Sequence, residues 1–393
     1  MNNNRSTVPT APQKAMSDLA SLVIAGAFVC LSVLSLPLAE AQSPGAGLGK
    51  AVVHTALGGF ILGYDVDSTG TEGLLSEALN AAGGKFDVAI ETFDQKTGKI
   101  LKIVDEEKNT NNDFVTFGIF GSSVGLVEEE LSKGIYVDKR VYGTLNPLNG
   151  NKVTGQWTPP FTKNDIVISV PFSQGSQSTP VLYFDNSGNN FNSYIIDTSV
   201  AANTFGKPIT ISAPPFSWSV SPVIAYDSQT NQAVLGGSLG CFGCTTEIGL
   251  VDLTTGGLDE FEGLGFGFIN GIAVDPNTGI ACTATEDDFS VEFYNLANQT
   301  GFIVPLQGAT NQANSGGAVA VDPIHKLFLI GQEFSSVGVG SSIQVYDEQG
   351  NFIEAVNGLK LPASSAYMAL HPSQRAGYVI VTPDLTELQS FTY

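Results

Sequence analysis

The sequence is poor in charge, and above all in positive charge. Only 14% of its 393 residues are charged, and 17 Lys and Arg stand against 38 Asp and Glu, which gives a formal net charge of −21. A nucleic-acid-binding protein needs a basic surface to neutralise phosphates, so no nucleic-acid partner is expected. The acidic excess is typical of a solvated surface that resists aggregation, and it also attracts cations.

Residue patterns that mark catalysis or zinc binding are scarce. The three histidines have no zinc-ligand spacing relative to one another or to the four cysteines. No Ser-His-Asp arrangement, GxSxG turn or phosphate-binding loop is readable, so no catalytic residue is predicted. The histidines are His54, His325 and His371.

Three of the four cysteines follow residue 41. Cys241 and Cys244 lie in the short sequence CFGC and could close a small disulfide ring, because export permits disulfides. Cys282 lies in the apolar stretch GIACTAT and is expected to be a buried thiol.

The first 41 residues differ in kind from the rest. Arg5 and Lys14 precede an apolar run that ends in Ala39-Glu40-Ala41, a small-x-small pattern that signal peptidase cleaves. This predicts a signal peptide over residues 1–41 and a secreted or periplasmic protein without a stable membrane anchor. The alternative is a retained anchor, because the run is long enough to span a bilayer.

Glycine is abundant, with 44 residues, whereas sustained helical periodicity is rare. Many short strands joined by tight turns have this composition. Because no linker or low-complexity segment divides residues 42–393, we expect one domain of the all-β class.

A strand followed by a turn recurs in the second half of the chain. The segments VIAYDS, NGIAVDPNTG, GAVAVDPIHK and MALHP have their anchors at 227, 275, 322 and 371, which are 48, 47 and 49 residues apart. Two positions before each anchor an alanine stands between two large apolar residues. Side chains of a strand alternate between its faces, so each strand has one small and one bulky face. The alanines are Ala225, Ala273, Ala320 and Ala369.

A second marker closes a later strand of each unit, at intervals of about fifty residues. It is Asp or Asn before a turn, with Thr in the last unit, and the expected role of Asp and Asn is to cap the turn. The seven markers are Asp94, Asn146, Asp197, Asp252, Asn295, Asp347 and Thr392.

Together the two markers predict a seven-bladed β-propeller of four-stranded antiparallel blades. The last unit lacks an outer strand, and residues 50–57 could supply it, closing the ring and covering a sheet edge. The alternative is a flexible leader and a three-stranded last blade. The expected blades are 58–108, 113–160, 165–213, 220–263, 270–307, 316–361 and 366–393 with 50–57.

The repeated GIAVDP strand and turn resemble those of secreted bacterial propellers of the YVTN and NHL type and of the seven-bladed lactonase superfamily. The resemblance covers residues 50–393, although the first three units lack the Asp-Pro turn. It implies a propeller in which the connections from second to third strand, and from fourth strand to the next blade, share the binding face. Such proteins include both enzymes and binding modules.

Acidic residues are found in the connections from second to third strand. Glu286 and Asp287 lie in TATEDDFS, Glu333 in GQEFSSVGVGSS and Asp384 in VTPDLTE. These four are candidate ligand-binding residues, and Glu286, Glu333 and Asp384 could together hold a divalent cation such as Ca²⁺ through oxygen ligands. The alternative is that the acidic loops are simply solvated.

Two functions are consistent with this pattern. The first is a secreted, monomeric, non-catalytic propeller that binds a protein or small ligand on its loop-rich face. The alternative is a metal-assisted, lactonase-like hydrolase or lyase whose cation polarises an ester carbonyl. Trp218, Phe266 and Phe268 fall near the same face and either contact a partner or pack between blades. The DPNTG-type turns belong to the opposite face and are expected to be structural.

Overall fold

A computed structural model of the protein divides the chain into two units, Met1–Ala41 and Gln42–Tyr393. The structure describes residues 46–120, 124–133, 136–145, 154–157, 166–168, 178–185, 192–199, 204–205, 209–211, 223–238, 244–285, 290–308, 314–334, 341–359, 361, 368–381 and 385–393. The predicted signal peptide lies outside these residues. Within them, no helix has the length and apolar character needed to cross a membrane.

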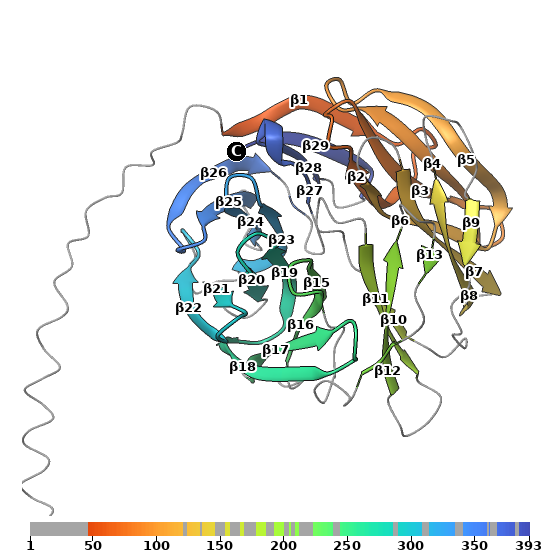
Figure 1. Ribbon diagram of the computed structural model, residues 1–393. Coiled ribbons are helices and arrows are strands. Elements are labelled where there is room, and N and C mark those ends of the chain that lie inside the picture. Colours follow the sequence, from red (N-terminus) through yellow and green to blue (C-terminus); the bar gives the residue numbers. More distant parts are fainter. Residues whose placement is uncertain are drawn as a thin grey trace, which may run out of the picture. The chain divides into compact units, whose positions relative to one another are not determined.

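The second unit consists of seven antiparallel β-sheets, numbered here in chain order (Figure 1). Sheets 1 and 2 have four strands each, in chain order. Sheet 1 contains β2 (Phe60–Val66), β3 (Glu72–Ala81), β4 (Lys85–Asp94) and β5 (Ile100–Thr110). Sheet 2 contains β6 (Asn112–Phe120), β7 (Val124–Lys133), β8 (Tyr136–Leu145) and β9 (Thr154–Trp157).

Sheet 3 departs from the predicted four strands because its outer strand is split. Both β13 and β14 pair with β12. Pro208 lies between β13 and β14 in the sequence. Because proline has no amide hydrogen to donate to the sheet, it explains why the outer strand is interrupted. Sheet 3 contains β10 (Ile166–Ile168), β11 (Ser178–Asp185), β12 (Asn192–Ser199), β13 (Thr204–Phe205) and β14 (Ile209–Thr210).

Sheets 4, 5 and 6 repeat the regular four-stranded order. Sheet 4 contains β15 (Val223–Asp227), β16 (Gln232–Ser238), β17 (Thr245–Asp252) and β18 (Leu258–Phe266). Sheet 5 contains β19 (Ile269–Asp275), β20 (Ile280–Thr285), β21 (Ser290–Asn295) and β22 (Thr300–Pro305). Sheet 6 contains β23 (Asn314–Asp322), β24 (Leu327–Phe334), β25 (Ser341–Asp347) and β26 (Phe352–Leu359).

Sheet 7 joins the two ends of the second unit. It contains β27 (Ala369–His371), β28 (Ala376–Ile380), β29 (Glu387–Thr392) and β1 (Gly47–His54), and the 3-10 helix η2 (Pro372–Gln374) links its first two strands. β1 lies antiparallel to β29, with Val53 opposite Leu388 (Figure 1). The predicted pairing of the N-terminal strand with the last strand is therefore present, over Gly47–His54 rather than residues 50–57.

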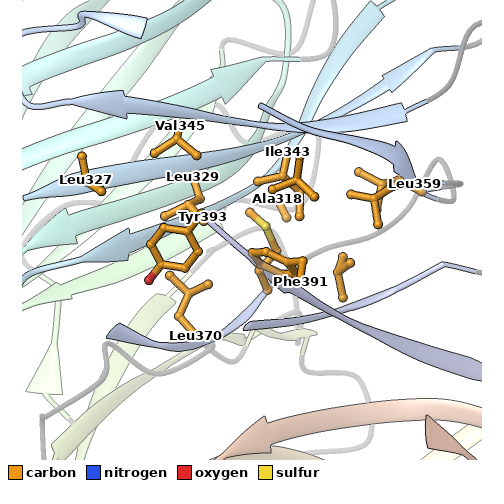
Figure 2. Close-up of a cluster of buried hydrophobic side chains, with 13 residues drawn as sticks. Ala318, Leu327, Leu329, Ile343, Val345, Leu359, Leu370, Phe391 and Tyr393 are labelled. Atoms are coloured by element: carbon orange, nitrogen blue, oxygen red, sulfur yellow. The ribbon is translucent and has the colours of Figure 1, made fainter. Parts of the chain in front are cut away.

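Six clusters of buried apolar side chains connect the sheets in series. They join sheet 3 to 4, 4 to 5, 5 to 6, 6 to 7, 7 to 1 and 1 to 2. Figure 2 shows the cluster in which Leu329 and Val345 of sheet 6 pack with Leu370 and Phe391 of sheet 7. The described residues contain no such cluster between sheets 2 and 3, so the closed seven-bladed ring stays a prediction.

The first strand of a sheet divides its side chains between two neighbouring sheets. In sheet 5, Ile272 and Val274 of β19 belong to the cluster shared with sheet 4, whereas Ala273 belongs to the cluster shared with sheet 6. The other three predicted alanines likewise pack toward the following sheet. They are Ala225, Ala320 and Ala369. The small face predicted from the sequence is thus the face that meets the next sheet.

We expect enlargement of Ala273 to destabilise the fold, because its side chain is buried in the apolar cluster shared with sheet 6. Ala273→Leu should lower the free energy of unfolding by about 1–3 kcal/mol, the usual cost of overpacking. Urea unfolding measures the change, and Ala297→Leu in an exposed turn is the matched control. Equal stability of the two variants would contradict the close approach of sheets 5 and 6.

Removal of β1 should also destabilise the protein. A secreted chain that begins at Thr55 loses Ala51 and Val53 from the cluster between sheets 7 and 1. Burying one such side chain contributes about 1.5–3 kcal/mol, so the melting temperature should fall by several degrees. An excess of the peptide 46–54 should restore it. An unchanged melting temperature after truncation would show that β1 is dispensable.

Candidate functional site

The predicted ligand-binding residues lie outside the part whose side chains are described. Glu286, Asp287 and Asp384 fall in segments that the structure does not describe, and Glu333 is described only in its backbone, opposite Ser315. The acidic binding site and the Ca²⁺ site built on these residues therefore stay predictions. Trp218 is also outside the described residues, whereas Phe266 ends β18 with a relative exposure of 51%.

The cysteines differ in their surroundings. Cys244 directly precedes β17 and is disulfide-bonded, but its predicted partner Cys241 lies outside the described residues. Cys282 is a free thiol with no exposed surface, which confirms the sequence expectation. Burial, and then the charge of Glu292, raises the pKa of the Cys282 thiol. A neutral buried thiol is unreactive, so Cys282 acts as a core residue.

The four Asp and Asn markers whose side chains the structure describes, Asp94, Asp252, Asn295 and Asp347, cap turns at the ends of third strands, as predicted. Asp252 Oδ1 accepts the amide of Thr254 at 2.6 Å, and Asn295 Oδ1 accepts that of Ala297 at 3.1 Å. The hydrogen bond from the Thr254 amide is the main cause of the lowered pKa of Asp252. These side chains are occupied by their own turns and are not catalytic groups.

Buried polar side chains of third strands hold the connections that arrive from the preceding sheet. In sheet 6, Gln344 donates to the Gln307 carbonyl at 2.8 Å and accepts the Gln307 amide at 2.9 Å. Gln307 follows β22 of sheet 5. In sheet 5, Tyr294 accepts the amide of Leu264 from sheet 4 at 2.9 Å and donates to Glu292. The sheet 6 bridge thus holds the connection after β22, and the sheet 5 bridge holds the end of the last strand of sheet 4, β18.

Sheet 1 builds the same bridge from two carboxyl groups. Glu91 accepts the amide of Ala56 at 3.2 Å, while Glu77 accepts the amides of Leu57 at 2.7 Å and Gly59 at 2.9 Å. Both carboxyl groups are fully buried. Burial, the hydrogen bond to Glu77 and the charge of Glu77 raise the pKa of Glu91 to about 9. The pair therefore shares a proton at neutral pH.

A pair of carboxyl groups that shares one proton can act as an acid and a base in catalysis. Here the pair is fully buried, and its remaining acceptors are occupied by the amides of the 55–59 connection. In sheet 6 the neighbouring buried side chains Gln332 and Gln344 bond to each other. The geometry indicates a brace in both sheets rather than an open catalytic site.

Replacing Glu91 with Gln should stabilise the protein at alkaline pH. The folded-state pKa of Glu91, about 9, lies above that of an unfolded Glu, about 4.3. As pH rises between these values, the unfolded chain releases a proton that the folded chain keeps, so stability is lost. Glu91→Gln needs no proton, and we expect a gain of about 1–2 kcal/mol near pH 8.

Thermal unfolding between about pH 4 and 9 measures this difference. The gain of Glu91→Gln over the native chain should disappear at the acidic end. Gln344→Glu provides the reciprocal control, because it places a carboxyl group in the sheet 6 brace and should weaken the protein as pH rises. A stability difference for Glu91→Gln that does not change with pH would rule out the shared proton.

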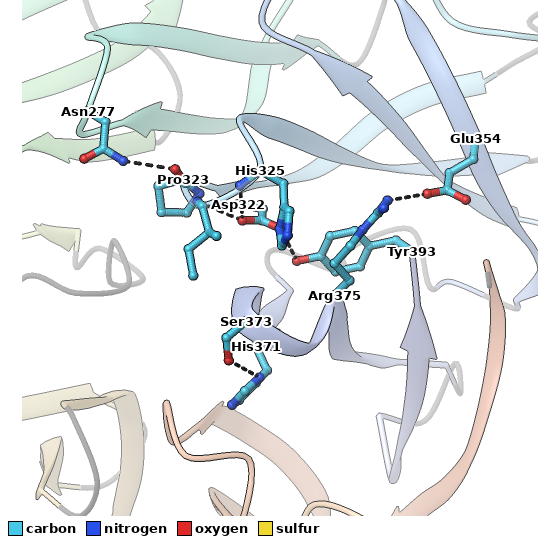
Figure 3. A network of polar contacts seen from close by, with 10 residues as sticks. Asn277, Asp322, Pro323, His325, Glu354, His371, Ser373, Arg375 and Tyr393 are labelled. Carbon is cyan, nitrogen blue, oxygen red and sulfur yellow. Dashed lines mark hydrogen bonds and ion pairs between the residues drawn. The ribbon is translucent and has the colours of Figure 1, made fainter. Parts of the chain in front are cut away.

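The turns between first and second strands form a second polar network (Figure 3). Asp322 Oδ2 lies 2.7 Å from Nδ1 of His325, and it accepts a hydrogen bond from the hydroxyl of Tyr393 at 3.1 Å. Asn277 donates to the Pro323 carbonyl at 3.0 Å, and Gln229 donates to the Asn277 carbonyl at 2.9 Å. Consecutive DPNTG-type turns are therefore tied from sheet 4 through sheet 6.

The pairing of His325 with a buried carboxylate is the arrangement that orients histidines in catalytic and metal sites. His325 is partly exposed. The guanidinium carbon of Arg375 lies 5.6 Å from the centre of the Tyr393 ring, and its Nη2 pairs with Glu354 Oε1 at 2.6 Å (Figure 3). No nucleophile adjoins His325 among these contacts. The described side chains also contain no group of three or more His, Cys, Asp and Glu that could hold a metal.

No protein-family model matches the chain, and no curated protein sequence is significantly similar to it. The resemblance to YVTN, NHL and lactonase-like propellers thus rests on the strand and turn motifs and on the repeated four-stranded sheets.

Proposed function

We propose that the protein is a secreted seven-bladed propeller that binds a partner, without catalysis, through the connections from second to third strand and from fourth strand to the next sheet. The serial packing of sheets 3 through 7, 1 and 2 and the pairing of β1 with β29 support the ring. Residues 1–41 support export, because positively charged residues precede an apolar run that ends in a small-x-small cleavage pattern.

The bridges from third strands to arriving connections carry this proposal. Gln344 holds Gln307, and Glu77 and Glu91 hold the 55–59 connection, all through buried hydrogen bonds. A connection fixed before binding loses less conformational entropy when it contacts a partner. The sheets therefore use their buried polar side chains to preorganise segments that belong to the proposed binding face.

The acidic residues of the same face favour a partner with positive charge. Glu286, Asp287, Glu333 and Asp384 are spread over three connections, and the chain as a whole has a net charge of −21. Attraction between such charges speeds association and weakens with salt. We therefore propose a basic protein segment or a cationic small molecule as the ligand class.

The test compares two variants with the same change in charge. Glu286→Gln, Asp287→Asn and Asp384→Asn together neutralise three of the four candidate carboxylates, whereas Glu106→Gln, Glu107→Gln and Glu262→Gln neutralise three carboxylates of the outer strands β5 and β18. Binding to a panel of basic peptides and polyamines is measured by titration calorimetry. We expect affinity to fall about tenfold in the first variant and to stay native in the control, consistent with about 1.4 kcal/mol.

Equal affinity of the two variants would place binding elsewhere. Hydrolysis of a lactone or ester that requires Glu286 and Asp384 would instead establish the lactonase-like alternative, and assays on a panel of lactones decide this point.

A further inference from the structure

A buried aspartate anchors the turn between first and second strands in sheets 4, 5 and 6. The three side chains are almost entirely without exposed surface. In each, Oδ1 accepts the amide two residues later, at 2.7–2.9 Å. The second oxygen, Oδ2, then needs a donor of its own, because an unpaired buried acceptor is costly. The three residues are Asp227, Asp275 and Asp322.

In sheets 4 and 6 the side chain three residues after the aspartate provides this donor. The hydroxyl of Thr230 donates to Asp227 Oδ2 at 2.8 Å, and Nδ1 of His325 lies 2.7 Å from Asp322 Oδ2. Asp322 Oδ2 also accepts the hydroxyl of Tyr393, which follows the third strand of sheet 7.

Sheet 5 lacks both donors. Its corresponding residue, Thr278, donates to Glu348 instead, and Asp275 Oδ2 has no hydrogen-bond partner. Glu348 follows the third strand of sheet 6, the position that Tyr393 has in sheet 7. A carboxylate therefore stands where a hydroxyl donor is found at the next boundary, and it lies within hydrogen-bonding range of Asp275.

Two facing carboxylates are both acceptors and need a proton or a cation between them. In sheet 1 the amides of the 55–59 connection donate to the facing carboxyl groups, whereas no donor reaches the buried Oδ2 of Asp275. Lys326 is the nearby cation, but its Nζ is 4.0 Å from Glu348 and its side chain is 59% exposed. This lysine therefore provides no hydrogen bond to Asp275 Oδ2.

We propose that Asp275 and Glu348 bind a Ca²⁺ ion at the boundary between sheets 5 and 6, with the Thr278 hydroxyl as a third oxygen ligand. All three groups are hard oxygen donors, and water completes the coordination. Ca²⁺ fits a buried site better than Mg²⁺, which gives up its hydration water reluctantly. The ion ties the DPNTG turn of sheet 5 to the turn that begins at Asp347 in sheet 6.

This site is separate from the acidic connections and independent of the proposed binding function. It has only two carboxylates. Because extracellular sites of such modest charge bind Ca²⁺ with dissociation constants of about 0.1–1 mM, we expect the same range here. A few millimolar Ca²⁺ should therefore saturate it.

The experiment is thermal unfolding of the full secreted chain near pH 8, first stripped with chelator and then given about 10 mM Ca²⁺. The native protein should gain about 2 °C, and calorimetric titration should show the bound ion. Glu348→Gln places an amide donor against Asp275, so it should be more stable than the native chain in chelator and should lose both the Ca²⁺ shift and one binding site.

Glu262→Gln is the matched control, since it changes the net charge equally at an exposed position of the outer strand β18 and should keep the native Ca²⁺ response. Circular dichroism checks that each variant is folded. No Ca²⁺ response in the native protein would overturn the proposal, as would a native number of Ca²⁺ sites in Glu348→Gln, which would assign the ion to the acidic connections instead.

Discussion

The close approach of successive sheets at their first strands is the constraint on which the structure depends. Successive side chains of a strand point to opposite faces, so a strand between two sheets must pack against both of them at once. Here large residues such as Ile272 and Val274 fill the space toward the preceding sheet, and Ala273 lets the following sheet approach. Repetition of this asymmetry gives the series of sheets a direction, because each bulky face meets the small face of its neighbour.

Such close packing buries polar groups along with apolar ones. A connection that crosses from one sheet to the next has backbone amides and carbonyls that lose contact with water and need partners. The third strands supply them through Gln344, Glu91 and the Glu292–Tyr294 pair. At the opposite strand ends, Asp227, Asp275 and Asp322 do the same for the turns. Much of the buried charge in this acidic protein is therefore structural.

The repeat was predictable because its markers are local. The alanines and the strand-end Asp and Asn residues predict the seven sheets, and the missing outer strand of the last unit points to the N-terminus. The split outer strand of sheet 3 was not predicted, although Pro208 was a readable signal. The polar bridges were also missed. Their signal is a Glu or Gln three positions before a marker, found at Glu91, Glu292 and Gln344.

What the sequence does not give is the partner of each buried polar side chain, because that partner comes from another strand, either of the same sheet or of the next one. Glu91 and Gln344 have the same place in their sheets, yet one faces Glu77 and the other Gln332. Asp322 and Asp275 are equivalent too, but Tyr393 stands by one and Glu348 by the other. A proton bridge arises between the fully buried Glu77 and Glu91, whereas Asp275 Oδ2 is left without a donor beside Glu348. Equivalent positions in a repeat therefore acquire different chemistry from the residue that a neighbouring strand or the adjacent sheet brings to them.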